Sequence, residues 1–119
     1  MGEAGIDAIR AKSLSLTTLA IELHDAWLAP LGFSLGTPRE PERRGGHLAL
    51  RHPDAWRIRC ALIERASVVP DFRLPDSIRF GFPPLYTSHA DVWEAFARLR
   101  RLVEEGEHLA FSEALARVT

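Results

Sequence analysis

Several features that many enzymes and membrane proteins share are missing from this chain. Cys60 is the only cysteine, so an intramolecular disulfide is excluded and a reducing compartment is favoured. No apolar run approaches the roughly 20 residues of a membrane-spanning helix. The first residues lack a charged leader followed by an apolar segment. The sequence therefore predicts a cytoplasmic protein with no membrane partner.

Charge of one sign is not in excess either. The formal net charge of the 119 residues is −1, which gives no overall basic field for nucleic acid. The basic residues Arg98, Arg100 and Arg101 flank an apolar helical stripe, so they are interpreted as a solvated face. A content of 46% hydrophobic and 26% charged residues is typical of one small soluble domain.

Motifs of self-contained catalysis are absent. The histidines show neither HExxH nor a Cys/His metal spacing; they are His24, His47, His52, His89 and His108. There is no GxSxG elbow and no glycine-rich phosphate loop. Cys60 falls within an amphipathic stretch, where an inert thiol is expected. We therefore predict no catalytic, metal-binding or cofactor-binding residue in this chain.

The segment Pro70–Phe96 organises the rest of the chain. In its strand, apolar Ile78, Phe80 and Phe82 alternate with Arg79 and Gly81, so the two sets lie on opposite faces. One interpretation is a fixed cation beside space for a ligand. The other is a solvated arginine on the open face of an antiparallel sheet, and the pattern alone favours this second interpretation.

A long helix is predicted over residues 5–29, because apolar side chains recur at helical spacing. They are Ile9, Leu16, Ala20, Leu23 and Trp27. Pro30 and Gly32 should end this helix. Strands are predicted over residues 32–37 and 47–51, paired antiparallel across the polar connector 38–46. Arg43, Arg44 and His47 cluster at the end of the connector, where they either contact an anion or are simply solvated.

A second helix is predicted from His52-Pro53 to Arg65, with proline at its first position. A strand over residues 67–72 should lie at a sheet edge, because Pro70 cannot donate to a ladder. Ser88 and Asp91 form the pattern of a capping box for a third helix. Its apolar stripe is Val92, Phe96, Leu99 and Val103. Gly106 should end it, with an extended tail beyond.

These elements predict an α+β fold, with a small antiparallel or mixed sheet and helices packed on one face. We expect a single domain over residues 1–119. Residues 1–30 would form a connecting helix, and residues 31–119 would form the body of sheet and helices.

The pattern RxPxxIRFGFxPLYT over residues 73–87, followed by Asp91-Val92-Trp93, resembles the C-terminal domain of kynureninase. The resemblance continues upstream through GIDAIRAKSLSLT, PREPERRGGHLALRHPDAW and ALIERASVVPDFR. It implies the small domain of the aspartate-aminotransferase-like enzymes that use pyridoxal phosphate. The larger, cofactor-binding domain of that family has no counterpart here.

The resemblance implies a role in hydrolysing kynurenine, or its 3-hydroxy form, to anthranilate, or its 3-hydroxy form, and alanine. Arg79 matches the arginine that holds the substrate α-carboxylate, and a planar guanidinium suits that ligand. Arg73 also falls in the motif, with a supporting role. Tyr86 either lines the site or packs beside Pro84. Lys12, the only lysine, has no motif around it, so pyridoxal phosphate is expected only in the complete enzyme.

Two functional hypotheses remain open. In the first, the chain is part of a kynureninase, inactive alone, with the missing large domain as its partner and a tendency to self-associate. In the second, it is a free-standing, non-catalytic interaction module that kept the fold. Cysteine desulfurase and other relatives fit RFGFxPLYT less well.

Overall fold

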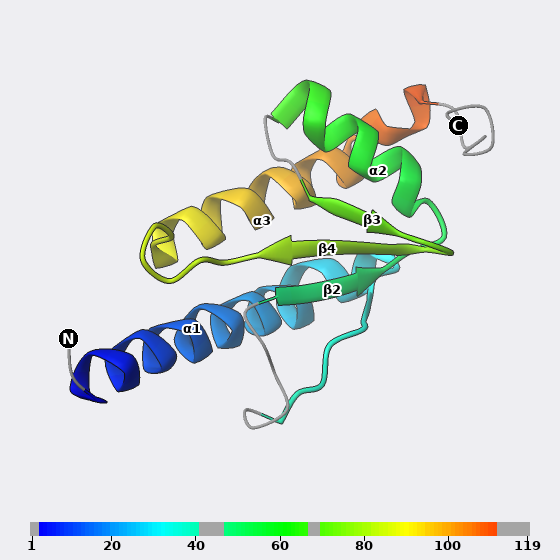
Figure 1. Cartoon of the computed structure of the whole chain (residues 1–119). Helices are drawn as coiled ribbons and strands as arrows, with labels where there is room; N and C mark the ends of the chain where they lie inside the picture. The colour runs from blue at the N-terminus through cyan, green and yellow to red at the C-terminus, as the bar shows by residue number, and fades with distance from the viewer. Residues whose placement is uncertain (1–2, 41–46, 67–69, 112–119) are drawn as a thin grey trace.

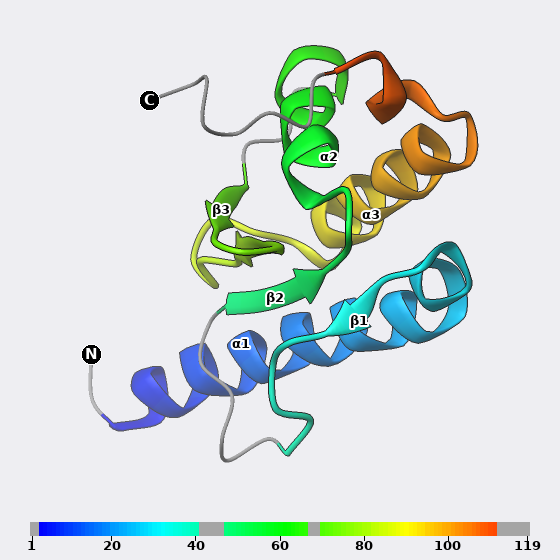
Figure 2. The same cartoon turned by 90° about the vertical axis from the view of Figure 1, so that its right-hand side faces the viewer.

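The computed structural model describes residues 3–40, 47–66 and 70–111. Within these residues, one antiparallel sheet in the order β1-β2-β4-β3 packs with three longer helices. In both Figure 1 and Figure 2, α3 lies between α1 and α2. The α+β class is therefore as predicted. No helix in the described ranges has the length and apolar character to cross a membrane.

The sheet is built from short strands. They are β1 (Ser34–Leu35), β2 (His47–Arg51), β3 (Asp71–Arg73) and β4 (Ser77–Gly81). β1 pairs with β2 across the polar connector, as predicted, although β1 is shorter than the expected strand. β3 occupies an edge, as Pro70 predicts. Residues 67–69 of that predicted strand lie outside the described residues.

One face of the sheet forms half of the core. Its side chains alternate with those of the other face, and all are at most 5% exposed: Leu48, Leu50, Ile78 and Phe80. The ring centroids of Phe80 and Phe82 lie 5.4 and 6.4 Å from that of Phe96 on α3. The predicted phase of the β4 strand is therefore confirmed.

The first helix, α1 (Glu3–Leu23), carries the predicted buried stripe, with Leu16 and Ala20 fully inaccessible. The chain is helical over the whole predicted range, residues 5–29, but the α-helical part ends at Leu23. The chain continues as a π-helical turn, His24–Leu28, and then a short 3₁₀ turn. Pro30 has no N–H for a regular helical ladder, so α-helical hydrogen bonding cannot run through it. Gly32, at φ 97°, then reverses the chain into β1.

The N-terminal turns of α1 extend beyond the strands (Figure 1). Ile6 there is 64% exposed, and Ile9 is only half-buried. The apolar stripe of α1 is therefore covered by the rest of the described chain only in its C-terminal part.

The second helix, α2 (Ala55–Ala61), begins later than predicted. Pro53 does not take the first helical position, because the buried His52 ring lies at the helix entrance. His52 Nδ1 accepts a hydrogen bond from the Asp54 amide at 2.9 Å, and its Nε2 donates to the Leu31 carbonyl at 3.1 Å. This arrangement requires the neutral Nε2–H tautomer of His52, because Nδ1 must be an acceptor.

The third helix, α3 (His89–Glu104), starts with the predicted capping box. Ser88 Oγ accepts from the Asp91 amide at 3.0 Å, and Asp91 Oδ2 accepts from the Ser88 amide at 2.9 Å. Leu102, rather than Val103, is the buried residue in the last turn of its stripe.

Beyond α3, the predicted extended tail is wrong within the described residues. Gly106 ends the helix at φ 70°, as expected, but a 3₁₀ turn follows over Glu107–Ala110. This turn packs against α2 and the π-helical turn Leu62–Ala66 that continues it, since Arg57 Nε donates to the Phe111 carbonyl at 2.9 Å and Arg65 pairs with Glu107 at 3.5 Å. Tertiary hydrogen bonds and ion pairs therefore fold back a segment that has no helical signature of its own.

Candidate functional site

The face of the sheet opposite the core is the candidate site, called here the open face. Strand register and side-chain alternation place nine residues on it. They are Ser34, His47, Ala49, Arg51, Asp71, Arg73, Ser77, Arg79 and Gly81. Arg79 lies in the middle, with Ala49 as its register partner on β2 and Asp71 as its partner on β3.

The Arg79 side chain is 34% exposed and is held loosely. Its Nη2 lies 3.6 Å from Asp71 Oδ2, which is an ion pair longer than a hydrogen bond. Its Nε is buried and has no hydrogen-bond partner among the described residues. A guanidinium has five N–H donors, so Arg79 keeps donors free for a planar anion such as a carboxylate.

The space beside Gly81 is bordered on one side by His47. Gly81 is exposed, and a Cβ built on it would lie 3.5 Å from Cδ2 of His47, its register partner, which is an ordinary van der Waals contact. That a ligand occupies this space stays a prediction. Ala49 is another short residue beside Arg79, and Gly36 lies next to it, with a built Cβ 3.3 Å from that of Ala49.

His47 therefore belongs to the open face, where it is exposed at the start of β2. Arg43 and Arg44, with which the sequence groups it, lie outside the described residues. Only the cross-strand register reveals that His47 is close to Gly81, since 34 positions separate them in the chain.

Arg73 lies on the open face at the edge strand, exposed and without an ion pair to the described residues. Arg51, on the other side of Ser77, is paired with Asp76 at 3.2 Å. Two further arginines therefore share the open face with Arg79: Arg51 is paired with Asp76, whereas Arg73 has no ion pair among the described residues. The roles proposed for Arg73 and Arg79 stay predictions.

Tyr86 is not packed against the described residues, contrary to the expectation that it packs beside Pro84. Its side chain is 85% exposed and that of its neighbour Leu85 is 66% exposed, in the connection between β4 and α3. Pro83 and Pro84 stop the strand, as the sequence indicates, and the two large side chains after them extend into solvent.

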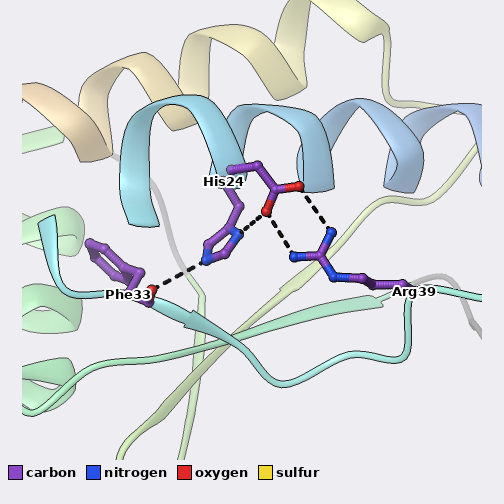
Figure 3. A network of polar contacts seen from close by, with 4 residues as sticks. His24, Phe33 and Arg39 are labelled. Carbon is purple, nitrogen blue, oxygen red and sulfur yellow. Dashed lines mark hydrogen bonds and ion pairs between the residues drawn. The ribbon is translucent and has the colours of Figure 1, made fainter. Parts of the chain in front are cut away.

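A separate polar network ties the end of α1 to the segment after β1 (Figure 3). Arg39 donates two hydrogen bonds of 2.9 Å to the Asp25 carboxylate, and His24 Nδ1 lies 2.9 Å from the same group. The hydrogen bonds from Arg39, and then from His24, lower the pKa of Asp25 to about 2. His24 Nε2 also lies 3.4 Å from the Phe33 carbonyl, so this network is a structural clamp.

The described residues contain no group of three or more potential ligands that could hold a metal ion. Cys60 is half-buried, and burial raises the pKa of its thiol, which favours the inert form. Lys12 lies on α1, where its charge acts on Asp91 at the start of α3. It is therefore on the helical side of the molecule, away from the open face.

His108 is the buried histidine with a displaced proton equilibrium. Burial, above all, lowers its pKa; Asp54 opposes this effect, and His52 and Arg57 add to it. Its Nδ1 has no hydrogen-bond partner among the described residues, and its Nε2 lies 3.8 Å from Asp54 Oδ2. The neutral ring therefore fits this position, and the imidazolium does not.

The free energy of unfolding should consequently fall as the pH drops through about 6.5, the ordinary histidine pKa. Between that value and the lower folded-state pKa, the unfolded chain binds a proton that the folded chain does not. Urea denaturation of the wild type and of His108→Gln, at pH 8 and at pH 5, measures the effect. The glutamine variant should lose less stability on acidification. An equal loss in both proteins would show that other groups carry the pH dependence, and exposed His89→Gln is the matched control.

The structure is a small α+β domain in which helices cover one face of the sheet, and Arg79 lies in the middle of the other, open face. Residues 9–99 match the family described as the kynureninase C-terminal domain, so the chain belongs to that family. It is 41% identical over 110 residues to kynureninase of Geobacillus thermodenitrificans, covering 92% of this chain and 26% of the relative. It is 40% identical over 112 residues to kynureninase of Pseudomonas fluorescens, covering 87% of this chain and 27% of the relative. The chain thus spans about a quarter of the length of these relatives.

Proposed function

We propose that this chain is the C-terminal part of a kynureninase and that Arg79 binds the carboxylate of kynurenine or 3-hydroxykynurenine. The parent reaction is hydrolysis to anthranilate, or its 3-hydroxy form, and alanine. The observation that carries the proposal is the position of Arg79: a partly exposed guanidinium on the open face whose ion pair among the described residues is a 3.6 Å contact from Nη2 to Asp71. A carboxylate can accept two parallel hydrogen bonds from such a group.

The cofactor of this reaction, pyridoxal phosphate, does not fit the residues of this chain. When bound, it supplies an electron sink and is held as a Schiff base to a lysine. Lys12 is the only lysine in the sequence, and it lies on the helical side near Asp91. The work of this chain is therefore to bind and orient the substrate carboxylate, while the rest of the enzyme supplies the lysine.

Exposed apolar side chains support docking of this chain onto a larger part. They are Ile6 on α1, Leu74 between β3 and β4, Leu85 and Tyr86 after β4, Trp93 on α3, and Leu109 in the turn after α3. Such surfaces are commonly covered by a partner. We propose that the remaining three-quarters of a kynureninase covers them, and that the isolated chain self-associates through the same surfaces. We also propose a cytoplasmic location, the reducing compartment that suits a chain with one cysteine.

The test is to join this chain to the part of Geobacillus thermodenitrificans kynureninase that precedes the matched quarter. Alone, the chain should not hydrolyse kynurenine and should sediment as more than a monomer at high concentration. Joined, it should form an active enzyme in the presence of pyridoxal phosphate. A joined protein that folds and binds the cofactor but stays inactive would favour the alternative, a non-catalytic interaction module. A borohydride-reducible adduct on Lys12 of the isolated chain would contradict the division of roles.

A further inference from the structure

Asp71 and Arg79 stand side by side on the open face, because they are register partners on β3 and β4. The 3.6 Å between Asp71 Oδ2 and Arg79 Nη2 allows an ion pair but no hydrogen bond. The Asp71 side chain is 69% exposed, so water weakens the attraction. Asp71 is therefore a counter-ion that attracts Arg79, but the attraction is weak enough for another carboxylate to displace it.

Both planar ways of binding a carboxylate to an arginine use the same atom. The end-on arrangement uses Nη1 and Nη2, and the side-on arrangement uses Nε and Nη2; because Arg79 Nε is buried, the end-on arrangement is the accessible one here. Nη2 is the Arg79 atom nearest to Asp71. On the other side of Arg79, the side chain of its register partner Ala49 is a methyl group, which cannot form a hydrogen bond or ion pair with the guanidinium. Asp71 is therefore the one acidic side chain among the described residues that competes with a ligand carboxylate for Arg79.

We propose that Asp71 is a resident counter-ion that competes with the substrate carboxylate for Arg79 and so sets the affinity of the open face. This inference rests on the proposed function, because it assumes that Arg79 binds a carboxylate. Two carboxylates flanking one guanidinium repel each other, and in a largely hydrated setting this repulsion amounts to about a three- to fivefold difference in affinity. Asp71 is a specificity-determining residue that tunes binding, and it carries out no chemical step.

The experiment follows the Arg79 Nε–Hε signal of the isolated chain by NMR during titration with L-kynurenine. Asp71→Asn keeps the shape of the side chain and removes its charge, and the signal should then report a dissociation constant about three- to fivefold lower than that of the wild type. Asp76→Asn is the matched control. It removes the same charge from the neighbouring Arg51 pair, and it should change the constant by less than about twofold.

A dissociation constant that stays the same or rises in Asp71→Asn overturns the inference, as does an Arg79 signal that moves in neither protein. Equal movement in wild type and Asp71→Asn overturns the inference alone, because it still shows that the ligand reaches Arg79. The proposed function is judged separately by the activity of the joined enzyme. Thermal melts of the variants show whether the fold is retained.

Discussion

Replacing Arg79 with alanine should raise the KM for kynurenine and lower kcat/KM by about one to two orders of magnitude in the joined enzyme. Hydrogen bonds that involve a charged group contribute about 1.5–3 kcal/mol. Each 1.4 kcal/mol is about tenfold in an equilibrium constant, which gives this range. Arg79→Lys should recover only part of the loss, since an ammonium cannot reproduce the planar fork. Steady-state kinetics with kynurenine measures both effects.

Two other arginines control this experiment. Arg101→Ala removes an exposed arginine from the last turn of α3, and it should leave the kinetics unchanged. Arg73→Ala removes the neighbouring arginine of the open face and should act more weakly than Arg79→Ala. If Arg79→Ala keeps near-normal kinetics while Arg73→Ala loses substrate binding at unchanged thermal stability, the carboxylate site has been assigned to the wrong arginine.

Replacing Phe96 with alanine should lower the free energy of unfolding by about 3–5 kcal/mol. Phe96 is fully inaccessible, and its ring contacts Phe80 and Phe82, so its removal leaves a cavity where the sheet meets α3. The lost transfer energy and the cavity both contribute to this effect. For a domain of this size, such a loss is a large part of the whole stability.

Urea denaturation monitored by circular dichroism measures the loss. Tyr86→Ala is a matched control, because it also removes a large aromatic ring, but one that is 85% exposed. That variant should change the stability of the isolated chain by no more than about 0.5 kcal/mol. A loss below about 1 kcal/mol for Phe96→Ala would mean that the contact between sheet and helix contributes little to folding.

Local patterns in the sequence predicted the features that depend on a few neighbouring residues. Alternation placed Phe80 and Arg79 on opposite faces, and the structure agrees. The Ser88 pattern predicted a capping box, which is present. Pro70 predicted an edge strand, because a missing N–H is a local property that no tertiary contact restores.

Features set by distant contacts could not be predicted in this way. His47 lies beside Gly81 because two strands share a register, and neither strand's sequence alone predicts that register. The late start of α2 depends on the His52 ring reaching Leu31, which lies 21 positions earlier. The buried position of His108 depends on the 3₁₀ turn packing against α2. In each case the competing tertiary contact overrides the local propensity.

The two outer strands are the shortest elements of the sheet, with two residues in β1 and three in β3. An edge strand exposes unpaired N–H and C=O groups, and a long, flat edge recruits further chains into fibrils. Pro70 directly before β3, and Pro75 shortly after it, leave few such groups in a row. The short, proline-flanked edges are therefore expected to protect the isolated chain against amyloid-like growth. Any self-association should then use side-chain surfaces rather than strand pairing, which leaves each copy free to dissociate.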